Sequence, residues 1–345
     1  MNTIVDLIAG LMRPILALLM LGLAASADAA PDGPRIEGFP YPFEVHQFRF
    51  TSQRQALEMA YMDLPAAATN APAIVLLHGK NFSGAAWDQT AAALHDAGFR
   101  VVIPDQIGFG KSSKPESYQF TFHQLASNTH DLLRSLGLER AHIMGHSIGG
   151  MLAIRCALMY PAETRTLILV DPLGLEDWQA KRVPYATLDQ LYRQELNKTP
   201  EKVRAYEREN YYGGKWEPQY DRWIDLFAAF KNSADYPRMA WNQALTSDMI
   251  FTQPVCYEFG RLAPPVLLLM GQTDRTAPSR EQAPPDVQKL LGEYPTLGRQ
   301  AAAAMPPAQL VEFPGLGHSP QIQDFPRFIQ AVKEFLNQTN SVHGR

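Results

Sequence analysis

The chain has 345 residues, of which 46% are hydrophobic, 19% are charged and 10% are aromatic. This composition supplies enough apolar material for a large folded core and excludes a disordered or low-complexity chain. The 31 Lys and Arg residues against 35 Asp and Glu residues give a formal net charge of −4, and no local run of basic residues is present. Because nucleic-acid-binding proteins usually carry a basic surface, we expect no nucleic-acid partner.

The N-terminus has the pattern of a secretory signal peptide. An apolar run at residues 14–27 follows Arg13, and an A-x-A sequence ends at Ala29. The run is shorter than the roughly 20 residues that a membrane-spanning helix needs. An uncleaved anchor beginning near Ile4 is the competing interpretation, but Asp6 and Arg13 interrupt it. We therefore predict cleavage after Ala29, a secreted or periplasmic location, and no stable membrane insertion of the mature chain.

Short apolar runs alternate with amphipathic stretches along the mature chain. Predicted strands lie at residues 73–77, 100–104, 141–144, 166–170, 265–270 and 308–313. Predicted helices lie at residues 86–97, 122–136, 148–159 and 325–337. This alternation predicts an α/β fold with a mostly parallel central sheet and helices on both faces. Residues 43–51 and 56–62 are expected to add antiparallel strands at one edge.

The segment at residues 175–262 breaks this alternation. It has helical patterns at residues 187–196 and 223–230, and it holds 8 of the 13 Tyr and 4 of the 5 Trp. We interpret it as a helical cap inserted between the two parts of the core, residues 30–174 and 263–345. Large aromatic side chains pack a small helical layer, and some of them would line an apolar substrate pocket beneath the cap.

The most informative motif is Gly-His-Ser-Ile-Gly-Gly at residues 145–150. It lies directly after a predicted strand and directly before a predicted helix, which is the context of a nucleophile elbow. In an elbow, a tight turn presents the serine hydroxyl at the carboxyl edge of the sheet. An ordinary turn with a serine N-cap is the alternative. We predict that Ser147 is a catalytic nucleophile.

With this motif, the chain resembles the α/β-hydrolase superfamily over nearly the whole mature sequence. Residues 78–81 look like the family's oxyanion loop, residues 104–113 like its glycine-rich loop, residues 271–274 like its acid loop, and residues 315–320 like its histidine loop. The resemblance is to a capped serine hydrolase of the carboxylesterase-like branch. It implies a Ser-His-Asp triad, but it does not identify a substrate.

A serine hydroxyl is a poor nucleophile near neutral pH, so a base must take its proton as it attacks. The resemblance implies that His318 is this base and that Asp274 is the acid that orients it. The order Ser, Asp, His along the chain is the order of this fold. Asp171, which follows another predicted strand, is the alternative acid because some relatives carry their acid there.

The resemblance also implies that two backbone N–H groups bind the oxyanion of the tetrahedral intermediate. These belong to Ile148, directly after the nucleophile, and to Lys80, in the loop after the first buried strand. Losing one such donor typically costs about 3 kcal/mol of transition-state stabilisation. We expect the Lys80 side chain to lie in solvent, with the steering of an anionic substrate as the alternative.

These features predict an exported serine hydrolase that cleaves carboxylic esters through an acyl-enzyme on Ser147, with no metal or organic cofactor. Its expected substrate is a small-molecule apolar or aromatic ester, or a lactone. Amide hydrolysis, C–C bond hydrolysis and acyl transfer by the same triad are alternatives, as is a ligand-binding homologue without catalysis. Dehalogenases and epoxide hydrolases of similar architecture use aspartate in place of Ser147, so those activities are not expected.

Cys156 and Cys256 are the only cysteines, which is too few for a zinc knuckle or a disulfide framework. We expect two separate buried thiols. A single bridge between them is the alternative in an oxidising compartment.

Overall fold

The computed structural model describes residues 35–305 and 307–343, and for residues 340–343 it describes the backbone only. The predicted signal peptide and its cleavage site after Ala29 lie outside the described residues. Within the described part of the chain, no helix is long and apolar enough to cross a membrane.

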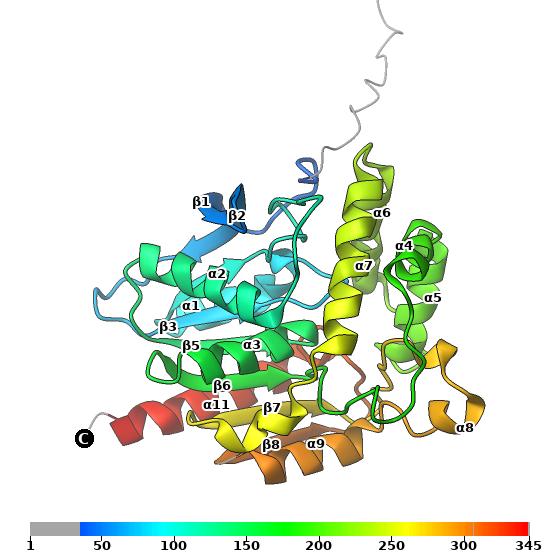
Figure 1. Cartoon of the computed structure of the whole chain (residues 1–345). Coiled ribbons are helices and arrows are strands. Elements are labelled where there is room, and N and C mark those ends of the chain that lie inside the picture. Colours follow the sequence, from blue (N-terminus) through cyan, green and yellow to red (C-terminus); the bar gives the residue numbers. More distant parts are fainter. Residues whose placement is uncertain (1–34, 306, 344–345) are drawn as a thin grey trace, which may run out of the picture. The chain divides into compact units, whose positions relative to one another are not determined.

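Eight strands form one sheet in the order β1-β2-β4-β3-β5-β6-β7-β8 (Figure 1). Their bounds are β1 Val45–Ser52, β2 Gln55–Leu64, β3 Ala73–Leu77, β4 Arg100–Pro104, β5 Ala141–His146, β6 Thr164–Val170, β7 Val266–Gly271 and β8 Ala308–Phe313. Strand β2 pairs antiparallel with β1 and β4, and every other pair is parallel. The predicted mostly parallel sheet and its antiparallel edge are confirmed.

Helices cover both faces of this sheet (Figure 1). On one face, α2 (Phe122–Ser135), α3 (Ile148–Met159) and α9 (Tyr294–Ala304) contribute to one large core. On the other face, α1 (Asp88–Asp96) and α11 (Phe325–His343) contribute to a second core. Because both faces are covered, β3, β5 and β7 are buried at every residue, and near-continuous apolar runs suit such strands.

The chain between β6 and β7 forms a helical insert, drawn in green and yellow in Figure 1. Its helices are α4 Leu188–Leu196, α5 Pro200–Asn210, α6 Asp221–Asn232 and α7 Tyr236–Thr252. At the start of α4, the Thr187 side chain accepts from the Gln190 N–H, and the Gln190 side chain accepts from the Thr187 N–H. These two bonds form a capping box that fixes the start of the helix. The predicted insertion of a helical layer into an α/β core is confirmed.

The turn between β5 and α3 depends on two glycines that leave room for neighbouring backbone. A Cβ atom on Gly149 would lie 2.2 Å from the carbonyl oxygen of Leu77, and one on Gly145 would lie 2.1 Å from the carbonyl oxygen of Gly149. Cβ atoms do not approach backbone so closely. The start of α3 can therefore lie against the end of β3 only because these positions carry no side chain.

We predict that Gly149→Ala lowers the free energy of unfolding by more than about 3 kcal/mol, because the added methyl group forces packed backbone apart. The matched control is Gly260→Ala, where the nearest atom to the new Cβ is the carbonyl oxygen of Ala304 at 3.9 Å. We expect the control to change stability by less than about 1 kcal/mol. Urea unfolding of both variants measures this difference, and equal losses would contradict the close-approach argument.

Candidate active site

Ser147 occupies the turn between β5 and α3 in a backbone conformation that L-residues rarely adopt, with φ 57° and ψ −120°. Hydrogen bonds on both sides hold it there: its N–H donates to the Val170 carbonyl over 3.0 Å, and its carbonyl accepts from the Leu173 N–H over 3.1 Å. Such strain persists only where surrounding contacts determine it. The residue lies at the N-terminus of the 12-residue helix α3, where the helix dipole favours developing negative charge.

Asp274 and His318 form a buried pair at the same edge of the sheet. The Nδ1 atom of His318 lies 2.6 Å from Oδ2 of Asp274, and both side chains are fully buried. The other carboxylate oxygen of Asp274 accepts from the Thr276 N–H over 2.7 Å. The Nε2 atom of His318 is buried and has no hydrogen-bond partner. With Nδ1 bonded to the carboxylate, Nε2 is the atom left to accept a proton.

Asp171, the alternative acid, has a different role in the fold. Its Oδ1 accepts from the Gly271 N–H over 2.8 Å, which links the ends of β6 and β7. Burial, and then the nearby charge of Asp274, raise the pKa of the Asp171 carboxyl well above its ordinary value. The structure therefore brings Asp274 to His318 and leaves Asp171 as a buried backbone acceptor.

His146, inside the predicted elbow motif, holds the backbone of the histidine loop. Its Nε2 lies 2.7 Å from the carbonyl oxygen of His318. Burial, together with the neighbouring His318, lowers the pKa of His146 well below its ordinary value. A neutral imidazole that donates from Nε2 suits this contact. His146 thus supports the position of His318 from β5.

The predicted oxyanion loop follows β3 and lies beside Ser147. The Phe82 N–H donates to the Gly79 carbonyl over 3.2 Å, which closes the loop as a turn. The Nε2 atom of His78 accepts from the Gln106 N–H over 3.1 Å, which ties this loop to the loop that follows β4. Lys80 and Ser147 line the same cavity. The N–H of Ile148 belongs to the first residue of α3, where helix N–H groups have no intrahelical acceptor.

The expectation that the Lys80 side chain lies in solvent is wrong. Its side chain is 16% exposed, and its Nζ lies 2.8 Å from Oε1 of Glu195, at the end of α4. Glu195 also binds Lys198 over 2.7 Å. The sequence analysis missed this pair because 115 residues separate its members. One signal was present: Glu195 falls four residues after Leu191, on the buried side of an amphipathic helix.

The cluster of Lys80, Glu195 and Lys198 holds two ammonium groups and one carboxylate. Burial lowers the pKa of Lys80 to about 8, although the carboxylate of Glu195 opposes the shift. Burial alone would raise the pKa of Glu195, but Lys198 and Lys80 outweigh it and lower that pKa to about 2. Glu195 forms ion pairs with two ammonium groups, those of Lys80 and Lys198. The cluster therefore keeps Glu195 charged through the physiological range.

A cavity of about 500 Å³ lies between the insert and the sheet edge that carries Ser147. Apolar and aromatic side chains form much of its wall, including Phe82, Phe109, Leu173, Leu191, Phe227, Phe230, Met239 and Ile250. Tyr206, Tyr211 and Tyr236 of the insert also line it. Tyr212, Tyr220 and Trp223 do not line it and pack in a hydrophobic cluster that shares Tyr211 with the cavity wall. The aromatic residues of the insert therefore both pack its hydrophobic cluster and line the cavity beside Ser147.

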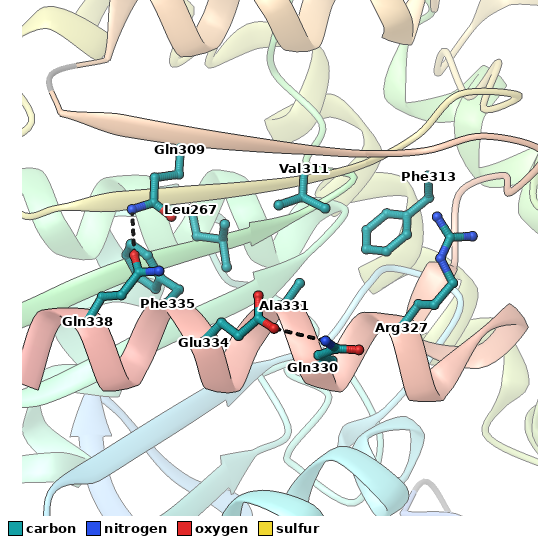
Figure 2. A pocket seen from close by; sticks show the side chains of 10 residues that line it. All are labelled: Leu267, Gln309, Val311, Phe313, Arg327, Gln330, Ala331, Glu334, Phe335 and Gln338. Carbon is teal, nitrogen blue, oxygen red and sulfur yellow. Dashed lines mark hydrogen bonds between the residues drawn. The ribbon is translucent and has the colours of Figure 1, made fainter.

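A second cavity, of about 240 Å³, lies between β7, β8 and α11 (Figure 2). Gln309 bonds to Gln338 over 3.0 Å and Gln330 bonds to Glu334 over 2.9 Å. Dashed lines mark both bonds in Figure 2. None of its ten lining residues is a serine, cysteine or histidine. This cavity therefore offers no serine with a histidine base, and the cavity at Ser147 is the candidate active site.

The two cysteines are both free thiols. Cys156 is buried in α3, where burial raises its pKa to about 12, and Cys256 is half-buried at the start of the 3₁₀ segment Cys256–Arg261. The structure thus has the separate thiols that the sequence favoured. In the described residues, no group of three or more His, Cys, Asp or Glu side chains is placed to hold a metal ion.

Comparisons with known proteins agree with this fold. The model of the Alpha/beta hydrolase family matches residues 74–331. A crystal structure of a probable hydrolytic enzyme from Pseudomonas aeruginosa PAO1 is 51% identical to this chain, with a TM-score of 0.86. The alignment covers 88% of this chain and 97% of the Pseudomonas chain.

Two curated relatives are more distant. Lipase 1 of Psychrobacter immobilis is 36% identical over 120 residues, which are 34% of this chain and 37% of the lipase. The 2-hydroxy-6-oxononadienedioate/2-hydroxy-6-oxononatrienedioate hydrolase of Comamonas testosteroni is 24% identical over 277 residues. That alignment covers 76% of this chain and 87% of the Comamonas enzyme.

We predict that Glu195→Gln lowers the free energy of unfolding by about 3 kcal/mol at pH 7, because it leaves Lys80 buried without its counter-charge. The folded-state pKa of Glu195, about 2, lies below its ordinary value of 4.5. Its stabilisation is therefore full above pH 4.5 and is lost as the pH falls towards 2. The difference in the free energy of unfolding between wild type and variant should therefore be about 1 kcal/mol smaller at pH 3.5 than at pH 7.

Urea unfolding at both pH values measures these differences. The matched control is Glu312→Gln, which breaks a pair with the exposed side chain of Arg299 at 2.9 Å. An exposed pair of this kind contributes less than about 1 kcal/mol. Equal effects of the two substitutions would contradict the importance of the buried cluster.

Proposed function

The chain belongs to the alpha/beta hydrolase family, and we propose that it hydrolyses carboxylic esters through an acyl-enzyme formed on Ser147. The observation that carries this proposal is the coexistence of a strained serine on the wall of a 500 Å³ cavity and a buried Asp274–His318 pair 2.6 Å apart. This combination supplies a nucleophile, a base and an acid that orients the base.

In the proposed reaction, the Oγ atom of Ser147 attacks the carbonyl carbon of the ester, and its proton passes to Nε2 of His318. Asp274 holds the other ring nitrogen and stabilises the imidazolium that forms. The backbone N–H groups of Lys80 and Ile148 bind the oxyanion. The intermediate then collapses, His318 returns the proton to the leaving alcohol, and the acyl group stays on Ser147. Water repeats the sequence and releases the acid.

The cavity supports an apolar or aromatic ester of medium size, or a lactone, as the substrate class. Its volume of about 500 Å³ lies in the range of pockets that enclose small molecules. Its apolar wall near Ser147 would bind an acyl group by burial of apolar surface. A lipase among the relatives supports ester chemistry, and a C–C bond hydrolase among them makes that bond class the main comparison.

We predict that a fluorophosphonate probe labels the mature protein once, on Ser147, and that Ser147→Ala abolishes the label. An activated serine attacks the phosphorus atom of the probe because a neighbouring base, here His318, accepts the hydroxyl proton. Intact mass and peptide mapping measure the adduct. A folded wild-type protein that takes up no label would contradict the proposed nucleophile and favour a ligand-binding homologue.

Steady-state kinetics on aryl esters complete this test. Asp274→Asn should lower kcat about 10³- to 10⁴-fold, because the base loses its orientation. Asp171→Asn is the matched control, since its carboxyl accepts the Gly271 N–H, whereas His318 bonds to Asp274. We expect it to leave kcat within about 3-fold. Turnover of an amide or a vinylogous diketone without ester turnover would contradict the ester proposal.

We also propose that the protein is exported and cleaved after Ala29. The apolar run at residues 14–27 and the small residues that follow it support this. The expected result is a secreted or periplasmic protein whose first residue is Ala30, which N-terminal sequencing of the recovered protein measures. Recovery of the chain with residues 1–29 intact in the membrane fraction would contradict cleavage.

A further inference from the structure

Tyr211 of the insert contacts both loops on which the proposed mechanism depends. It follows directly after α5, lines the cavity and is 5% exposed. Its own N–H donates to the Glu207 carbonyl over 2.7 Å, and the ring of Tyr206 packs edge-on against it at 5.7 Å. The residue is thus held firmly by the insert rather than by the core that it contacts.

The contacts with the histidine loop involve both the backbone and the ring of Tyr211. The N–H of His318 donates to the Tyr211 carbonyl over 2.9 Å. A Cβ atom on Gly317 would lie 2.2 Å from the same carbonyl oxygen, so the loop fits closely around it. The centroids of the Tyr211 ring and the His318 imidazole lie 4.6 Å apart, and the angle between the two ring planes is 35°. This contact covers the imidazole from the side of the insert.

The contact with the predicted oxyanion loop involves the phenol oxygen. The Asn81 side-chain amide donates to Tyr211 Oη over 3.0 Å, and Asn81 is the residue next to Lys80. The ring of Phe82 stacks on the Tyr211 ring at 6.2 Å with an angle of 27°. One side chain therefore spans the distance between the proposed base and the proposed oxyanion donor.

We infer that Tyr211 is a positioning residue for the proposed reaction, holding His318 through its carbonyl and ring and the oxyanion loop through its hydroxyl. The inference rests on the proposed function. The aromatic face beside His318 also stabilises the positive charge that the imidazole carries after it takes the serine proton. The insert then completes the catalytic apparatus and is more than a wall of the pocket.

The test compares Tyr211→Leu, which removes the ring and the hydroxyl, with Tyr211→Phe, which removes the hydroxyl alone. We expect Tyr211→Leu to lower kcat about 10²-fold, because small misplacements of catalytic groups have effects of this size. The rate of fluorophosphonate labelling should fall in parallel, since the probe reports on Ser147 without a bound ester. Tyr211→Phe should restore most of the rate and leave a loss of about 5- to 10-fold.

A double-mutant cycle isolates the hydroxyl contact. Asn81→Ala should reproduce the loss of Tyr211→Phe, and the double variant should lose no more than either single variant. The matched control is Tyr192→Leu, an insert tyrosine on α4 that packs against Trp241 at 5.6 Å outside the cavity. We expect its kcat and labelling rate to stay within about 3-fold of wild type.

Proton NMR of the hydrogen bond between His318 and Asp274 separates this inference from the proposed function. We expect a downfield Nδ1 proton signal in wild type and Tyr211→Phe, and its broadening or loss in folded Tyr211→Leu. An unchanged signal with unchanged kcat in Tyr211→Leu would overturn the inference, as would an equal loss in Tyr192→Leu.

If Tyr211→Leu does not fold, a kcat of Tyr211→Phe equal to that of wild type overturns the role of the hydroxyl. Absence of labelling in the wild type would count against the proposed function, whereas the NMR comparison would still test the positioning.

Discussion

Three backbone segments meet beside Ser147 without room for a side chain, and the arrangement of the candidate site depends on this contact. Gly149 lies against the end of β3, and Gly145 lies against Gly149. The turn between them contains Ser147 in its strained conformation with a positive φ. Since β3, β5 and β7 all end at this edge, the loops after them come close together. Packing of the core therefore brings Ser147, the predicted oxyanion loop and the residues after the predicted acid loop to the wall of one cavity.

The insert acts on this arrangement from the other side. Glu195 of α4 binds Lys80, and Tyr211 after α5 contacts both Asn81 and His318. Both connections reach loops of the core rather than its helices. Charge attraction, hydrogen bonding and ring packing thus join two layers that are far apart in the sequence. Lys80, Asn81, Glu195 and Tyr211 also line the cavity.

The fold and the centre of the candidate site could be predicted because their signals are local. The strand Ala73–Leu77 and the helix Ile148–Met159 have the predicted bounds. An apolar run predicts the strand, and flanking glycines help to predict the helix, so each signal lies within a few neighbouring residues. The proximity of Asp274 and His318 followed from the family resemblance and the sheet topology. The Lys80–Glu195 pair and the position of Tyr211 could not be predicted in this way, because each depends on how the insert packs.

The placement of the insert has a consequence for how this protein can diversify. Strands β6 and β7 are parallel neighbours, so the chain must in any case cross from the end of one to the start of the other. Extra helices in that crossover leave every strand register unchanged. Exchange of the insert between relatives would therefore be a ready route to new substrate ranges, with one restriction. If Tyr211 positions His318 as we infer, a transplanted insert must also bring an aromatic ring and a carbonyl acceptor to that place, so changes of the pocket are tied there to the proposed chemistry.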